Sequence, residues 1–383
     1  MRHKIKLCLL LVMMMSAAQT STGQVVETLV GNLGGRPEAL AVAPDGSIYT
    51  PMPQLAKVVR ITMDGLFSTV IISISLPEGG GFDSQGNYYV SAFNPGTIGK
   101  LTPDNIYTPA FATGFSGPTG IIMDTSKGFL YLANYNSNSV SKVNLSDSST
   151  TFFTSSGLIN GPDGFAFDDE GNLYLANFNN SAINKISSTG VVSHFVTFPG
   201  TGIGYITFAK GSIYVAGLGN NKIYKVTPQG DTSTVAGTGQ TGYLDGPALS
   251  AQFNRPNGIA ASITGDTIFI GDTFNQKIRM LILSGVGINT INSSIPERFS
   301  LRQNYPNPFN PSTEIVFSIP VKSNVSLKIY NTNGQEMKTL VEETVRPGNY
   351  KVTYTSEGLP SGVYFYSLKA DGYSETKKMI LVK

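Results

Sequence analysis

The sequence predicts an all-β protein, a six-bladed β-propeller followed by a small β-sandwich. Three observations support this fold class. Only 14% of the 383 residues are charged, and no long stretch shows the 3.6-residue periodicity of helices. A pattern with an aromatic strand recurs six times, and a segment of different composition follows the last copy. A chain of this length also favours more than one domain.

The clearest repeat runs from Pro162 to Asn177 and combines an apolar strand, an Asp/Gly turn and a second strand with an aromatic core. A third strand with a basic residue and a fourth strand rich in Thr and Val complete the copy, as in a propeller blade. The basic residues should extend over the blade surfaces. The aromatic anchors, spaced 40 to 43 residues apart before a last interval of 55, are Tyr49, Tyr89, Tyr131, Tyr174, Tyr214 and Phe269.

The sixth repeat lacks a fourth strand of its own. Residues 25–31 resemble residues 232–237, a fourth-strand segment of the fifth repeat. We therefore expect the N-terminal segment to complete the last blade, which would close the ring and remove two exposed sheet edges. The propeller is predicted to span residues 24–285.

The repeats carry Pro-x-Gly, Asp-x-x-Gly-Asn-x-Tyr and Asn-x-x-Ile-x-Lys elements. In these elements residues 24–285 resemble the NHL-repeat propellers. The resemblance implies a fold and leaves the activity open, because that family includes binding platforms, lactonases and lyases.

A polar linker is predicted at residues 286–298, and a second domain at residues 299–383. Six alternating strands and two hairpin turns, Asn333-Gly334 and Asp371-Gly372, predict a small immunoglobulin-like sandwich there. The domain opens with a dense Asn/Pro motif that forbids helix. That motif consists of Tyr305, Pro306, Asn307, Pro308, Phe309, Asn310 and Pro311.

Together with the segment from Leu359 to Tyr364 and a basic, apolar end, this motif closely resembles the type A C-terminal sorting domain of the bacterial type IX secretion system. The resemblance implies that an outer-membrane translocon recognises the folded tail. The protein should then be secreted or displayed on the cell surface after passing through the periplasm.

Residues 1–23 are predicted to be a signal peptide, with Arg2, Lys4 and Lys6 before an apolar run and small residues at Ser16 to Ala18. Its removal takes the single cysteine and one of two histidines, and leaves 24 basic and 25 acidic residues. This balance argues against a nucleic-acid partner. No other apolar stretch is long enough to span a membrane.

The central channel is the expected binding site. From the Pro-x-Gly position it should receive Glu38, Glu78, Asp163 and Asn257, and from a later loop Asn134, Asn177 and Asp272. Such oxygen-rich side chains suit calcium or another divalent cation. The predicted metal ligands are Glu78, Asn134, Asn177 and Asp272.

These residues favour a binding or interaction module for a glycan, a peptide, a small metabolite or a protein. The alternative is a divalent-metal-dependent, gluconolactonase-like hydrolase, with Glu78 as a ligand and Asp163 or Asp272 as the general base. A channel blocked by Tyr205 and Phe165 would instead favour a structural surface protein. His194 is predicted on an outer strand, which argues against lyases that need a central histidine.

Overall fold

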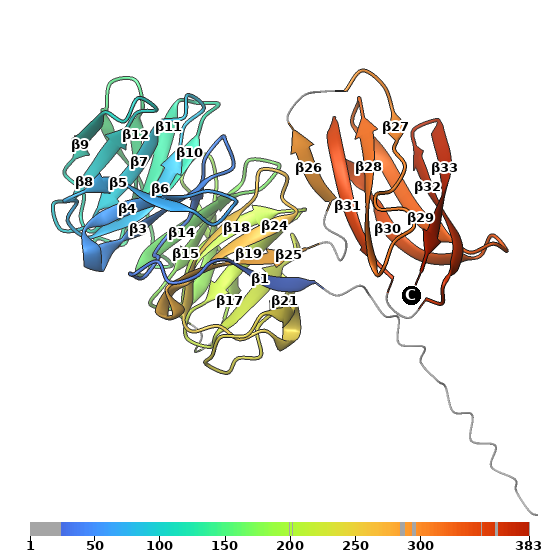
Figure 1. Cartoon of the computed structure of the whole chain (residues 1–383). Coiled ribbons are helices and arrows are strands. Elements are labelled where there is room, and N and C mark those ends of the chain that lie inside the picture. Colours follow the sequence, from blue (N-terminus) through green and yellow to red (C-terminus); the bar gives the residue numbers. More distant parts are fainter. Residues whose placement is uncertain are drawn as a thin grey trace, which may run out of the picture.

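The computed structural model describes residues 24–198, 200, 202–283, 288–292, 296–345, 347–356 and 359–382. The predicted signal peptide lies outside these ranges. Apart from three single-turn 3-10 helices, the regular elements of the described chain are β-strands (Figure 1). The predicted all-β class is confirmed.

Six antiparallel sheets, each built mainly from consecutive strands, form the six blades of the propeller (Figure 1). Blade one contains β2 (Ala41–Val42), β3 (Ile48–Met52), β4 (Lys57–Ile61) and β5 (Phe67–Ile72), and blade two contains β6 (Pro77–Phe82), β7 (Tyr88–Ala92), β8 (Thr97–Leu101) and β9 (Tyr107–Thr113). Blade three contains β10 (Pro118–Asp124), β11 (Phe129–Asn134), β12 (Ser139–Asn144) and β13 (Thr150–Ser155), and blade four contains β14 (Pro162–Phe167), β15 (Leu173–Asn177), β16 (Ala182–Ile186) and β17 (Val192–Thr197). Blade five contains β18 (Ile203–Ala209), β19 (Ser212–Gly217), β20 (Lys222–Val226) and β21 (Thr232–Ala236), and blade six contains β23 (Pro256–Ala261), β24 (Thr267–Asp272), β25 (Lys277–Ile282), β1 (Val25–Val30) and β22 (Gly246–Pro247). The 3-10 helices are η1 (Pro53–Leu55), η2 (Ala248–Ser250) and η3 (Thr273–Asn275).

The predicted closure of the ring is confirmed. Strand β1 pairs antiparallel with β25, with Val26 opposite Leu281, and both side chains are fully buried. On its other edge β1 pairs with the short β22, so that Val26 also lies opposite Gly246. The loop that lengthens the last repeat thus supplies a further strand to the closing blade and covers an edge that would otherwise be exposed.

The aromatic and basic residues of the repeats meet on the blade surfaces, as predicted. Tyr131 in β11 pairs with Lys142 in β12, and the Lys142 ammonium lies 4.1 Å from the centre of the Phe153 ring. The Lys185 ammonium lies 5.6 Å from the centre of the Tyr174 ring one blade later. Each long basic side chain therefore covers aromatic surface while its charge stays accessible to water.

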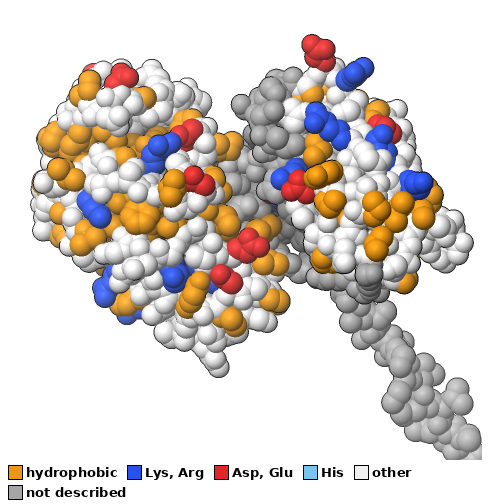
Figure 2. Space-filling view, viewed as in Figure 1, with side chains coloured by type: hydrophobic (Ala, Val, Ile, Leu, Met, Phe, Trp, Pro, Cys, Tyr) orange, Lys and Arg blue, Asp and Glu red, His pale blue; other side chains and the backbone are white. Residues whose placement is uncertain are grey.

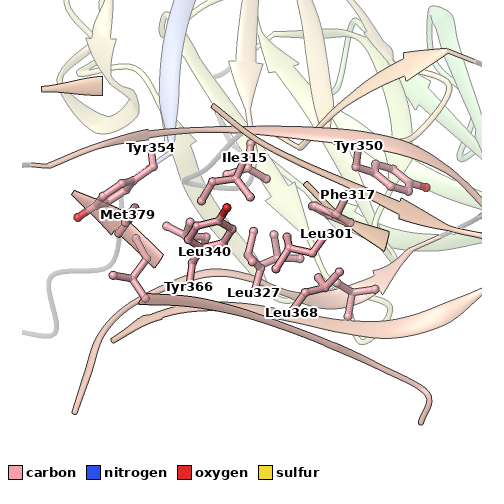
Figure 3. Packing of buried hydrophobic residues seen from close by; sticks show 14 of the residues in the cluster. Leu301, Ile315, Phe317, Leu327, Leu340, Tyr350, Tyr354, Tyr366, Leu368 and Met379 are labelled. Carbon is pink, nitrogen blue, oxygen red and sulfur yellow. The ribbon is translucent and has the colours of Figure 1, made fainter. Parts of the chain in front are cut away.

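The tail consists of two four-stranded sheets around one apolar core, which is the sandwich expected from its alternating strands (Figure 3). Phe317 and Leu327, from the two sheets, are both fully buried in that core. One sheet contains β26 (Ile288–Asn292), β31 (Gly348–Thr355), β28 (Ser312–Ile319) and β27 (Ser300–Leu301), and the other β30 (Glu336–Val345), β29 (Ser323–Tyr330), β32 (Gly362–Ala370) and β33 (Tyr373–Leu381).

Strand β26 lies where the sequence analysis places a linker. It pairs antiparallel with β31, with Ile288 opposite Val352. The asparagines make this segment look polar, but the β-branched Ile288, Thr290 and Ile291 give it strand propensity. The sandwich therefore includes residues 288–292, and its first strand begins before the predicted boundary at residue 299.

The visible face in Figure 2 shows apolar side chains spread between few charged groups, in keeping with the low charge content. Within the described part of the chain, no helix has the length and hydrophobicity needed to cross a membrane.

Candidate functional site

The residue that precedes the Gly of each Pro-x-Gly pattern, or its equivalent, lies at or just before the start of the innermost strand of its blade, and we call this central position the channel. Neighbouring inner strands approach closely at these glycines, since a Cβ on Gly79 would lie 2.3 Å from the Thr119 carbonyl oxygen, and one on Gly258 2.0 Å from that of Glu38. The pattern thus lets the inner strands pack edge to edge around one axis. The lining residues are Glu38, Glu78, Thr119, Asp163, Gly204 and Asn257.

Three of these lining residues are acids whose carboxylates act on one another across the channel. Burial and the charges of Glu38 and Asp163 raise the pKa of Glu78 to about 9. Burial and the Asp163 charge raise the pKa of Glu38 to about 7, against the effects of an Asn257 hydrogen bond and the Arg36 charge. Burial also raises the pKa of Asp163 to about 7. At neutral pH the group therefore retains protons that separate carboxyl groups would have lost.

Tyr205 occupies the position that Gly holds in four other blades. Its side chain is only 7% exposed, and burial followed by the charges of Asp163, Glu78 and Glu38 raises its pKa well above the ordinary value. The phenol O–H points its hydrogen toward the Asp163 carboxylate, and this contact opposes the rise in the Asp163 pKa. A buried phenol thus faces the three acids.

The side-chain amide of Asn257 is a further polar group in this channel. Its Nδ2 donates a hydrogen bond to Glu38 Oε1, and its side chain is 4% exposed. Its Oδ1 is buried, and no described group donates a hydrogen bond to it. The absent side chain at Gly204 makes room for this amide, because a Cβ there would lie 1.7 Å from Asn257 Oδ1.

The remaining predicted site residues, Asn134, Asn177 and Asp272, end the second strands of their blades. Each accepts a hydrogen bond from the loop that leads into the inner strand of the same blade. The donors are Ser116 N to Asn134 Oδ1 at 3.3 Å, Asn160 N to Asn177 Oδ1 at 2.9 Å and Asn254 N to Asp272 Oδ1 at 2.7 Å. The structure therefore gives these three residues a common loop-anchoring contact.

The predicted calcium ligands fall into two settings. Glu78 faces the channel acids, whereas the oxygens of Asn134, Asn177 and Asp272 accept hydrogen bonds within their blades. Asp272 Oδ2 also accepts from Arg279 Nη1 at 2.8 Å. Across the described residues, no cluster of three or more His, Cys, Asp or Glu side chains is arranged to hold a metal ion. The calcium site therefore stays a prediction.

Of the two side chains considered able to block the channel, only Tyr205 faces it. Phe165 packs between blades with Tyr131 and Leu175. His194 lies exposed on the outer strand β17, with Nε2 2.8 Å from Thr197 Oγ1. The channel acids therefore have no imidazole beside them.

Sequence reasoning missed an aromatic and cationic rim around the channel. Phe93 and Tyr135, which directly follow β7 and β11, have ring centres 6.2 Å apart. On the sixth blade, the guanidinium groups of Arg36 and Arg255 lie 4.0 Å and 5.0 Å from the centre of the Phe274 ring. The position of these aromatic residues in the repeat could have predicted the rim, because they lie one or two residues after the ends of the second strands.

The sorting motif of the tail is held against its last strand. Phe309 is buried in the sandwich core, and its N–H donates to the Ile380 carbonyl oxygen at 2.9 Å. Asn307 Oδ1 accepts from Ile380 N at 2.9 Å. Tyr305 is 79% exposed although its backbone pairs with Glu314. The motif therefore presents Tyr305 to solvent from a fixed backbone.

Comparison with known proteins finds similarity in two separate regions. Residues 303–383 match the family described as the secretion system C-terminal sorting domain. Residues 80–215 match the SMP-30/gluconolactonase/LRE-like region. The tail match shows that the protein is exported by the type IX secretion system, to the cell surface or into the medium.

Individual relatives are distant. SUPPRESSOR OF QUENCHING 1, a chloroplastic protein of Arabidopsis thaliana, is 36% identical over 83 residues, which are 21% of this chain and only 8% of that protein. A streptogramin B lyase is 16% identical with a TM-score of 0.52, over 69% of this chain and 99% of that chain. An auxiliary nutrient binding protein from Bacteroides ovatus is 17% identical with a TM-score of 0.60, over 68% and 76%. The two structures establish the propeller fold and nothing more.

Proposed function

We propose that the exported propeller is a binding module that takes up a small polar ligand in its central channel. The observation that carries the proposal is the convergence of Glu38, Glu78 and Asp163 on a channel that also holds the buried phenol of Tyr205 and an unpartnered amide oxygen of Asn257. Binding sites combine a concave position with a few convergent polar groups of this kind. A propeller of the same fold is described as an auxiliary nutrient binding protein, so the fold itself accommodates ligand binding.

The alternative is a lactonase-type hydrolase, and the gluconolactonase-like match over residues 80–215 favours it. That activity would need a metal or a base at the channel. The raised pKa of about 7 makes Asp163 a possible general base. However, three of the four predicted metal ligands are engaged in loop contacts. This arrangement favours binding over hydrolysis.

A ligand screen on the full-length protein separates the two functions. We expect isothermal titration calorimetry with a panel of sugars, amino acids, amines and lactones to find a ligand whose affinity falls at least tenfold in the Glu78→Gln variant. The Asp169→Asn variant, which removes an exposed carboxylate at a distant turn, should bind like wild type. Hydrolysis of gluconolactone that requires a divalent cation and is lost in Glu78→Gln would overturn the proposal in favour of the hydrolase.

A further inference from the structure

We infer that the channel ligand is a small organic cation, whose ammonium or guanidinium group binds among Glu38, Glu78 and Asp163. This inference rests on the proposed function and narrows it to one ligand class. It comes from the carboxyl groups of the channel, from a buried acceptor on Asn257 and from the lack of a metal-ligand cluster among the described acidic residues.

The channel concentrates negative charge without a cation of its own. Within the described residues, no Lys or Arg forms an ion pair with Glu38, Glu78 or Asp163. The nearest cationic influence is Arg36, which acts on Glu38 from the exposed rim, where its guanidinium stacks on Phe274. A positively charged ligand would supply the missing counter-charge in a site where water screens charges poorly.

A buried acceptor independently calls for a donor. Asn257 Oδ1 has no hydrogen-bond partner among the described groups, and its side chain is 4% exposed. A buried polar atom without a partner costs free energy that a ligand donor would recover. An ammonium group offers three N–H donors, and a guanidinium group offers five. Either group could therefore serve the carboxylates and this acceptor at the same time.

The described acidic residues favour an organic cation over a metal ion. A calcium ion needs its oxygens within about 2.3–2.6 Å of one point. None of the acidic clusters in the described chain meets such a requirement. Charge-assisted N–H···O bonds are longer, about 2.7–2.9 Å, and start from separate nitrogen atoms. A guanidinium group can thus bridge carboxylates that do not share a single centre.

Binding of a cation should release protons. The pKa values of Glu38 and Asp163, both about 7, and of Glu78, about 9, mean that the empty channel is partly protonated at neutral pH. A bound cation favours the ionised carboxylates, so these pKa values should fall. The other groups that act on the acids are Tyr205, which stays protonated, and Arg36, which stays charged. Affinity should therefore rise between pH 6 and pH 9.

The test uses the full-length protein and methylguanidinium chloride as the probe, with methylurea as its uncharged analogue. We expect calorimetry to show methylguanidinium binding at least tenfold more tightly at pH 9 than at pH 6, with proton release measured in buffers of different ionisation enthalpy. Methylurea should not bind measurably. The Glu78→Gln and Asp163→Asn variants should each lose at least tenfold in affinity, whereas Asp169→Asn should match wild type.

The outcomes separate this inference from the proposed function. If a neutral ligand of the screen binds with dependence on Glu78 and methylguanidinium does not bind at pH 9, the cation inference is overturned and the binding function stands. The inference is also overturned if calcium binds with dependence on Glu78 and excludes methylguanidinium. If Glu78→Gln changes no binding event while circular dichroism shows it folded, both proposals fall.

Discussion

Two sets of buried acids in the propeller have opposite surroundings. In the sixth blade, Asp272 is fully buried and accepts hydrogen bonds from Arg279, Asn275 and Asn254 N. In the channel, Glu78 and Asp163 lack a cationic partner in the described part of the chain. Burial raises the pKa of Asp272 as well, but its donors and the Arg279 charge oppose that rise, whereas the channel acids raise the pKa values of Glu78 and Glu38 further. The comparison marks the channel as a site shaped by something other than stability.

The ion-paired acids of the sixth blade lead to the largest expected change in stability. Arg279 contacts both Asp272 and Asp245 and is itself fully buried. The Arg279→Met variant should lose about 3–5 kcal/mol of unfolding free energy, because it leaves buried carboxylate without a partner. Urea unfolding at pH 7 measures this loss.

The matched control is Arg60→Met. The side chains of the Arg60–Asp45 ion pair are 36% and 56% exposed. Such a pair should contribute no more than about 1 kcal/mol. Similar losses in the two variants would contradict the structural role assigned to Arg279.

The channel side predicts a dependence of stability on pH. In the unfolded chain Glu78 loses its proton near the ordinary carboxyl pKa of 4.5, but in the folded protein it keeps it up to a pKa of about 9. Between these values the folded state binds more protons, so stability must fall as pH rises. Because Glu78 is partly exposed, we expect a loss of about 1–3 kcal/mol from pH 5 to pH 9.

The Glu78→Gln variant should reduce this decline, while Glu38 and Asp163 maintain the rest of it, as measured by urea unfolding at the two pH values. Asp169→Asn should decline like wild type. A Glu78→Gln variant that loses as much stability as wild type would show that the channel acids do not share protons in the folded state.

The smallest effect distinguishes two buried tyrosines. The Tyr89 hydroxyl donates to Asp83 Oδ2 at 3.1 Å, whereas the buried Tyr88 hydroxyl has no hydrogen-bond partner among the described groups. Tyr89→Phe should therefore cost about 1 kcal/mol, and Tyr88→Phe should cost nothing measurable. Thermal unfolding of both variants tests this difference. An equal loss in Tyr88→Phe would show that its hydroxyl stabilises the fold.

Much of the fold follows from the sequence because each blade repeats the same local rules. Tyr131 and Tyr174 mark the second strands of their blades, and Lys142 and Lys185 mark the third strands. The similarity of residues 25–31 to a fourth strand predicts where the ring closes. The sequence analysis did not predict strand β26, because this strand forms by pairing with the distant β31 although its asparagines make the segment look polar.

The candidate site was predicted in part. Repeat position alone identified Glu38, Glu78, Asp163 and Asn257 as channel residues. It could not show that the asparagines at the ends of β11 and β15 bind the loops of their own blades, because side-chain partners depend on loop geometry. Tyr205 departs from the repeat, and that departure was the signal for its contact with the acids.

Ring closure by β1 has a consequence for the order of folding. Gln24 Nε2 donates to the Leu283 carbonyl oxygen, 259 residues along the chain. Contacts between such distant segments form late, since a very long loop must close first. While the chain emerges during synthesis, blades one to five can assemble from local hairpins, but β1 cannot pair until β25 has been made. The channel can therefore reach its final geometry only when the whole propeller has been made.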